Sequence, residues 1–66
     1  MKMDKQFQDI HYGDGRHEEL VIRCVMIKSI YFDNDRIRIT YKRPGYELNE
    51  FHIFIPIKRG YNLTID

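Results

Sequence analysis

The sequence predicts an all-β protein, a small antiparallel meander of four or five strands. Three observations support this. Isoleucine, tyrosine and phenylalanine are abundant while alanine is missing, and β-branched and aromatic residues favour strands. The stretch RIRITYK, residues 36–42, alternates apolar and basic or polar residues with the period of two that a half-buried strand shows. The stretches FDNDR and RPGYE look like turns that separate strands.

The length allows a single domain of 66 residues with a small core. Cys24 is the only cysteine, so no disulfide can form within the chain, and a lone thiol in an apolar run is typical of a reducing cytoplasm. No apolar run approaches the roughly 18 residues of a membrane span. We therefore expect a cytoplasmic protein without membrane contact, supplemented by self-association or by a partner.

Residues 1–17 differ from the rest of the chain and predict an N-terminal arm or a short helix, capped by Asp4 and ended by Gly13. Residues 18–66 then form the β-meander domain. Its first strand spans residues 19–32, with Cys24 on the buried apolar face, where a thiol is inert. Lys28 interrupts that face, which predicts a bulge or a bend near residues 27–29.

A two-residue loop, Asn34-Asp35, is expected to follow. It places Phe32 opposite Ile37 and Ile30 opposite Ile39, with all four side chains inward. Both charge and side-chain parity agree with this hairpin.

The next turn contains Pro44 and Gly45, and Gly45 supplies a positive φ. Odd residues of the strands on either side must face each other, which requires an odd loop length; a three-residue loop with a bulge is expected. The next strand, residues 47–57, then places Arg38 opposite either Glu50 or His52.

Pro56 cannot donate to a ladder and marks an edge strand. A last short strand, YNLTI, has Tyr61, Leu63 and Ile65 on one face. Its exposed edge predicts a homodimer through an edge strand. The sheet closes either as a small SH3-like barrel or as a curled sheet against the N-terminal segment.

One basic and aromatic sheet face is the candidate binding site, because tyrosine and arginine are the usual anchors of interfaces. Its residues are Tyr31, Arg36, Arg38, Lys42, Arg43, Tyr46, Glu50, His52 and Phe54. The same residues could stack bases and hold phosphates. Residues 20–43 carry six basic against two acidic residues, but the net charge of +1 argues against a dedicated DNA binder.

Catalysis is a weaker alternative. Glu50 and His52 beside arginines resemble a small ribonuclease site, in which a base takes the ribose proton and a cation neutralises phosphate. A sponge for an anionic nucleotide signal is a further alternative. We assign no catalytic residue and no cofactor. The spacing of His11, His17 and Cys24 lacks the close ligand pairs of a zinc site.

In size and composition the chain is similar to many small β-rich proteins of phages and mobile elements, which often bind and block a host enzyme or a defence nucleoprotein. We therefore expect a non-enzymatic inhibitor or adaptor of the anti-defence type. Its partner would be a host protein or nucleoprotein, with a nucleic-acid-binding module as the alternative.

Overall fold

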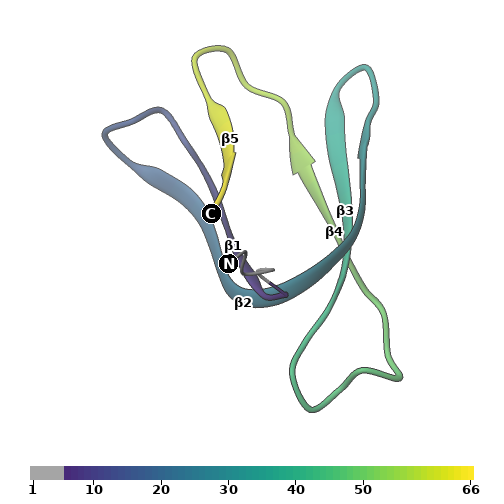
Figure 1. Cartoon of the computed structure of the whole chain (residues 1–66). Helices are drawn as coiled ribbons and strands as arrows, with labels where there is room; N and C mark the ends of the chain where they lie inside the picture. Colours follow the sequence, from purple (N-terminus) through teal and green to yellow (C-terminus); the bar gives the residue numbers. More distant parts are fainter. Residues whose placement is uncertain (1–5) are drawn as a thin grey trace, which may run out of the picture.

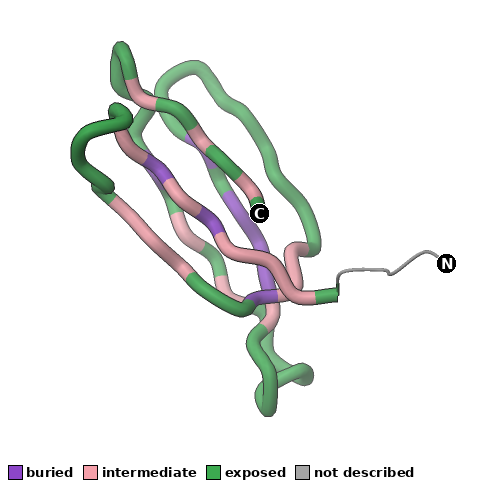
Figure 2. The backbone as a smooth tube through the Cα atoms, turned by 60° about the vertical axis from the view of Figure 1, so that its left-hand side comes forward, coloured by how far each residue is buried: buried purple, intermediate pink, exposed green. Residues whose placement is uncertain are grey.

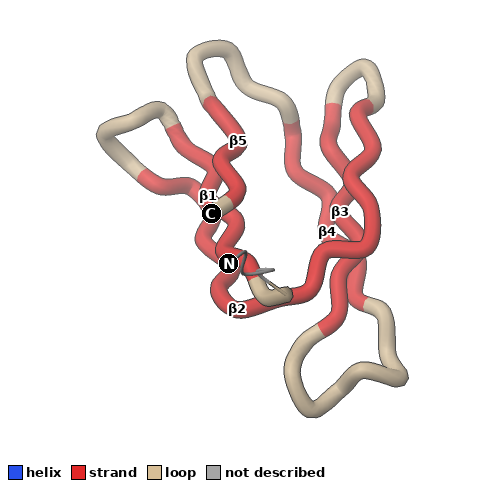
Figure 3. The backbone as a smooth tube through the Cα atoms, in the orientation of Figure 1, coloured by secondary structure: helices blue, strands red, loops and turns tan. Residues whose placement is uncertain are grey.

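The fold is all-β, as the sequence predicts, and a computed structural model describes residues 6–66 (Figures 1 and 3). No helix occurs among these residues. Five antiparallel strands pair in the order β4-β3-β2-β1-β5. They are β1 (Gln8–Gly13), β2 (Glu18–Phe32), β3 (Arg36–Lys42), β4 (Phe51–Pro56) and β5 (Asn62–Ile65).

The long strand β2 belongs to both halves of the sheet. Its first part, up to Val25, pairs with β1, and its second part, from Met26 to Phe32, pairs with β3. Between the two parts β2 curves, so that the halves rise on either side of it (Figure 1). β1 to β4 are a meander, and β5 returns to pair with β1, Ile10 lying opposite Ile65. β4 and β5 are the two ends of this strand order and no ladder joins them, so the sheet is curled and its hydrogen-bonded ladder is not closed.

Three register shifts lie along β2, and two of them flank Val25, where the strand changes partner. The register shifts between Ile27 and Ser29, which confirms the predicted bulge. A second shift lies opposite the segment between Gln8 and Ile10, where Cys24 adopts φ 60° and donates its N–H to the Asp9 carboxylate at 2.9 Å. The prediction of a buried Cys24 is wrong, since the residue is exposed. Extra residues in a bulge interrupt the alternation of side chains between the two faces of a strand.

The predicted arm or helix over residues 1–17 is wrong for residues 8–13, which form β1. Ile10 and Tyr12 are buried, and Gln8, Asp9 and His11 between and before them are more exposed, so the period is two rather than helical. The proposed cap at Asp4 lies outside the described residues. Gly13 is the last residue of β1, and only glycine fits there because a Cβ would collide with the backbone of His17.

The core lies between the two halves (Figure 2). It consists of Ile10, Tyr12, Val25, Ile37, Ile39, Tyr41 and Ile55. The inward isoleucines of β3 are confirmed. Phe32 and Ile30 lie opposite Ile37 and Ile39 as predicted, but they are 62% and 37% exposed. They share the inward face as predicted, but they lie beyond the part of β2 that β1 covers, which ends at Val25, and so remain partly open to solvent.

The β2–β3 hairpin has the predicted two-residue loop, and the Asp33 N–H donates to the Arg36 carbonyl oxygen at 2.9 Å. In the β3–β4 hairpin the predicted parity is confirmed, since Ile39 lies opposite Ile53. Both predicted partners of Arg38 are wrong, because Phe54 lies opposite it.

The β3–β4 loop explains that error in register. It spans residues 43–50 instead of three, so the strand begins at Phe51 rather than at Glu47. Two turns fill it, with N–H groups of Tyr46 and Asn49 donating to the carbonyl oxygens of Arg43 and Tyr46. Gly45 takes the expected positive φ of 83°. β4 lies at an edge of the sheet, which confirms the prediction from Pro56.

The gap between the two halves is bridged by Tyr12 of β1. Its hydroxyl donates to the Pro56 carbonyl oxygen and accepts from the Lys58 N–H, both at 2.9 Å. The side chain is almost fully buried. One phenol therefore ties the end of β4 to the opposite half of the sheet.

We predict that Tyr12→Phe lowers the free energy of unfolding by about 1–3 kcal/mol, because it leaves a part-buried carbonyl and N–H without their partner. Chemical denaturation measures the change. Tyr61→Phe is the matched control, since its ring packs beside Tyr12 with centroids 5.4 Å apart but lies outside the bridge. Equal effects of both substitutions would contradict the bridging role.

We predict that Cys24→Gly raises the free energy of unfolding by about 1 kcal/mol, because a left-handed conformation costs an L-residue roughly that much and glycine little. Cys24→Ala keeps the Cβ and should leave stability nearly unchanged. Thermal and denaturant unfolding compare the variants. A destabilised glycine variant would show that φ 60° carries no strain at this position.

Candidate binding face

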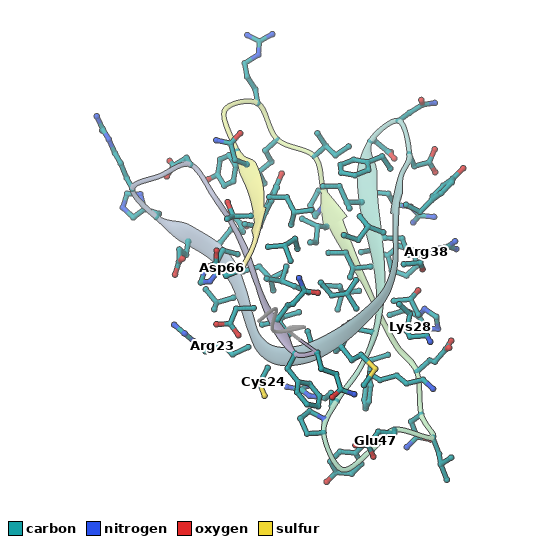
Figure 4. The ribbon with its side chains drawn as sticks, in the orientation of Figure 1. Arg23, Cys24, Lys28, Arg38, Glu47 and Asp66 are labelled. Atoms are coloured by element: carbon teal, nitrogen blue, oxygen red, sulfur yellow. The ribbon has the colours of Figure 1, made fainter. Side chains whose placement is uncertain are left out.

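Three of the predicted site residues form a row across the outer side of the sheet. Tyr31 of β2, Arg38 of β3 and Phe54 of β4 lie directly opposite one another in the two ladders. Side chains of directly opposed residues share a face, and the row is therefore set by register alone. Figure 4 shows Arg38 on the side of β3 away from the core.

Two arginines stack on the two aromatic rings of this face. The Arg36 guanidinium carbon lies 4.5 Å from the centroid of Phe54, and that of Arg38 lies 5.3 Å from the centroid of Tyr31. Each exposed contact of this kind is worth about 0.5–1 kcal/mol. Together with Asp33, these four residues line a shallow depression of about 40 Å³.

The face is exposed and its cations are available. Tyr31 is 56% and Phe54 52% exposed. Within residues 6–66, neither Arg36 nor Arg38 forms an ion pair. The ring contacts hold the arginine side chains without an ion pair within residues 6–66, so a partner would meet them already ordered. We call Tyr31, Arg36, Arg38 and Phe54 the arginine–aromatic face.

The other predicted site residues lie further along the sheet. His52 is opposite Thr40, and its Nδ1 lies 3.0 Å from the threonine hydroxyl. Lys42 ends β3, six residues from Arg36 and thus roughly 20 Å away along the strand. Arg43, Tyr46 and Glu50 are on the β3–β4 loop.

That loop is a separate feature from the arginine–aromatic face. It carries Tyr46 and Leu48, which are 60% and 100% exposed. Glu47 turns back onto it and accepts the Gly45 N–H at 3.1 Å, which lowers the pKa of its carboxyl (Figure 4). The structure therefore divides the predicted surface into an ordered four-residue cluster and a distant loop.

The predicted binding face did not include Asp33 or Thr40. The predicted hairpin already placed Asp33 opposite Arg36, which the structure confirms, but Asp33 was left out of the predicted binding face although it lines the same depression. Thr40 shares the outward parity of Arg36 and Arg38, so the alternation could have identified it. Its partner His52 could not be found, because the length of the next loop hid the register.

A second, larger concavity of about 560 Å³ lies between the β1–β2 loop and β5. His11 stands at its wall with Nδ1 2.8 Å from Glu18 and Nε2 3.4 Å from Asp66. It is lined by His11, Gly13, Gly15, Arg16, His17, Glu18, Asn62 and Thr64. Among residues 6–66 no cluster of three histidine, cysteine or acidic side chains is suited to a metal ion.

In comparisons with known proteins, no family model matches this chain, and neither curated proteins nor solved structures give a match. The part of the chain that the structure describes has no helix capable of crossing a membrane.

Asp14, in the β1–β2 loop beside the larger concavity, accepts the backbone N–H groups of His17 and Arg16 at 2.8 and 2.9 Å. The bond from His17, then that from Arg16, lowers the pKa of its carboxyl. The charged Asp14 carboxylate therefore stabilises the loop fully at pH values above its ordinary pKa. This stabilisation is lost as the pH falls through the lowered pKa.

We predict that the Asp14 carboxyl titrates with a midpoint below 3.8, the value for an unperturbed group. Carbon-detected NMR measures it, and the amide signals of Arg16 and His17 should move with the same midpoint. In Asp14→Asn, whose oxygen still accepts but carries no charge, this shared transition should disappear. A midpoint at or above 3.8 would contradict the two backbone bonds.

Proposed function

We propose that this protein is a non-enzymatic binding module, an inhibitor or adaptor that engages a protein partner through the arginine–aromatic face. The observation that supports it is the pairing of two half-exposed rings with two arginines that lack ion pairs among residues 6–66. Arginine, tyrosine and phenylalanine at an ordered surface are the usual anchors of protein interfaces. An acidic patch on the partner would complement Arg36 and Arg38.

Preorganisation strengthens the proposal. An interface loses free energy when long side chains must be ordered on binding, at about 0.5–1.5 kcal/mol for each. Here the guanidinium groups already rest on rings of neighbouring strands. Strand pairing fixes the backbone beneath them. Part of the ordering cost is therefore met during folding rather than during association.

The second candidate function, nucleic-acid binding, uses the same cations. Single-stranded nucleic acids bind by stacking bases on free aromatic faces, but Arg36 already covers one side of Phe54 and Arg38 one side of Tyr31. The net charge of +1 also gives little general attraction to phosphates. Both points favour a protein partner.

Two narrower expectations stay predictions. One is that the partner belongs to a host defence system and that the protein comes from a phage or a mobile element. The other is a cytoplasmic location, which the exposed thiol of Cys24 supports, since a free thiol survives best in a reducing compartment. A ribonuclease with Glu50 and His52 remains a weaker prediction, and Arg38, which was to assist it, lies opposite Phe54 instead.

The test compares a face variant with a matched control in affinity capture from a lysate of the source organism. Arg38→Ala/Phe54→Ser removes one cation and one ring from the face. Arg59→Ala/Leu48→Ser removes one cation and one apolar side chain from exposed loops. Capture is repeated after nuclease treatment and at salt concentrations from about 50 to about 500 mM.

We expect wild type and the loop control to retain the same proteins after nuclease treatment, and the face variant to lose them at least tenfold. Retention that disappears with nuclease, together with a steep salt dependence of binding to a labelled single-stranded RNA, would support the nucleic-acid alternative. Equal capture by wild type and the face variant would contradict both functions at this face.

A further inference from the structure

The larger concavity lies on the outer face of the first half of the sheet. Tyr12 of β1 points into the core, so its neighbours His11 and Gly13 lie on the opposite face of the strand. Thr64 is opposite His11 and Asn62 is opposite Gly13, and directly opposed residues share a face. The concavity therefore shares no residue with the arginine–aromatic face, which is on the second half of the sheet.

Gly13 forms the floor of this concavity. It lies directly between Asn62 of β5 and Glu18 of β2, and it has no side chain to fill the space between theirs. A Cβ at this position would collide with the backbone of His17, so the floor stays bare. The resulting volume of about 560 Å³ lies within the range of small-molecule sites.

The lining of the concavity is polar throughout, and it contains no apolar side chain. Most ligand sites are lined mainly by apolar side chains, so a ligand here has to be recognised by charge and hydrogen bonds. Arg16 and Glu18 are the lining residues that carry a full charge at neutral pH. Their charges are opposite, and within residues 6–66 they form no ion pair with each other.

Both charged groups are available to a ligand. Arg16 is exposed, forms no ion pair within residues 6–66, and has its backbone N–H held by Asp14 at 2.9 Å. Glu18 contacts His11 through Oε2 at 2.8 Å, but its side chain is 55% exposed and its Oε1 has no hydrogen bond in the described part of the chain. The nearby carboxylates are engaged, since Asp14 accepts two backbone N–H groups and Asp66 faces Nε2 of His11 at 3.4 Å.

We propose that the larger concavity binds a small zwitterion, a free α-amino acid with a polar side chain. The carboxylate of the ligand binds the Arg16 guanidinium, which can donate two parallel hydrogen bonds to it. The ammonium group of the ligand donates to the free oxygen of Glu18. The Thr64 hydroxyl and the Asn62 amide, on the wall formed by β5, bond the polar side chain of the ligand.

Other classes of ligand leave a charge of the concavity opposed or without a partner. A phosphate would meet Arg16 but also the carboxylates of Glu18 and Asp66. An amine without a carboxylate would meet Glu18 but also Arg16, and like charges at short range repel each other. An apolar molecule would find no apolar side chain in the lining. A zwitterion satisfies both charges at once.

The test titrates the full chain with L-glutamine and follows the amide NMR spectrum. Two analogues of the probe each lack one charged group: γ-aminobutyramide lacks the carboxylate, and glutaramate lacks the ammonium group. Inorganic phosphate and L-leucine represent the anionic and apolar alternatives.

Two variants each remove one charge from the concavity while keeping a polar side chain, Arg16→Gln and Glu18→Gln. Arg43→Gln and Glu50→Gln are the matched controls, because both residues are exposed on the β3–β4 loop. Circular dichroism establishes that each variant is folded.

We expect L-glutamine to shift the amide signals of Gly13, Gly15 and Thr64 with a dissociation constant of about 1 mM, because both ion pairs are exposed to water. Each analogue, phosphate and L-leucine should bind at least threefold more weakly. Arg16→Gln should remove the advantage of L-glutamine over γ-aminobutyramide, and Glu18→Gln should remove its advantage over glutaramate. The loop controls should keep both advantages.

Four results would each overturn the proposal. They are no shift of these signals up to about 50 mM L-glutamine, binding of an analogue, phosphate or L-leucine as tight as that of L-glutamine, advantages that persist in the Arg16 and Glu18 variants, and an equal loss in the loop controls. None of them affects the capture of a protein by the arginine–aromatic face, so the two proposals fail separately.

Discussion

The hydroxyl of Tyr12 is the contact on which the two halves of this molecule depend. Strand pairing runs continuously from β4 through β3, β2 and β1 to β5, but no ladder connects β4 with β5. The Tyr12 hydroxyl connects the two sides by donating to the Pro56 carbonyl oxygen and accepting from the Lys58 N–H. A core of seven buried side chains gains its enclosure from this bridge, since a curled sheet that opened would expose its inner face to water.

The sequence was enough to predict which face of a strand each side chain occupies. It was not enough to predict which residues pair across a long loop. The alternation of β3 and the short loop after Asp33 were enough to predict the β2–β3 register. The partner of Arg38 depended on how residues 43–50 fold, and two successive turns there leave no simple pattern. β1 was missed because six residues that alternate weakly around Ile10 and Tyr12 resemble a short helix beside a glycine. The register that sets Tyr31 opposite Arg38 was thus predicted, while the opposition of Phe54 to Arg38 was not.

The bend of β2 links fold and surface. Of the three register shifts along this strand of fifteen residues, those at Cys24 and at Lys28 lie where it passes from one half of the sheet to the other, and bulges of this kind bend a strand. The exposed Cys24 in its left-handed conformation is a consequence of the first shift (Figure 4). The second shift restores the parity that places Tyr31 outward beside Arg38. Without it, Phe32 would share the outer face and the arginines would lose one of their rings.

β2 pairs with β1 up to Val25 and with β3 from Met26 onwards. Within residues 6–66, each part of β2 therefore has one edge without a paired strand. The segment that follows Val25 is rich in aromatic and aliphatic side chains rather than in charge. A small protein gains little from keeping such an edge in water, because its own core is limited. The apolar character of residues 28–32 is therefore not explained by the strand pairing within residues 6–66.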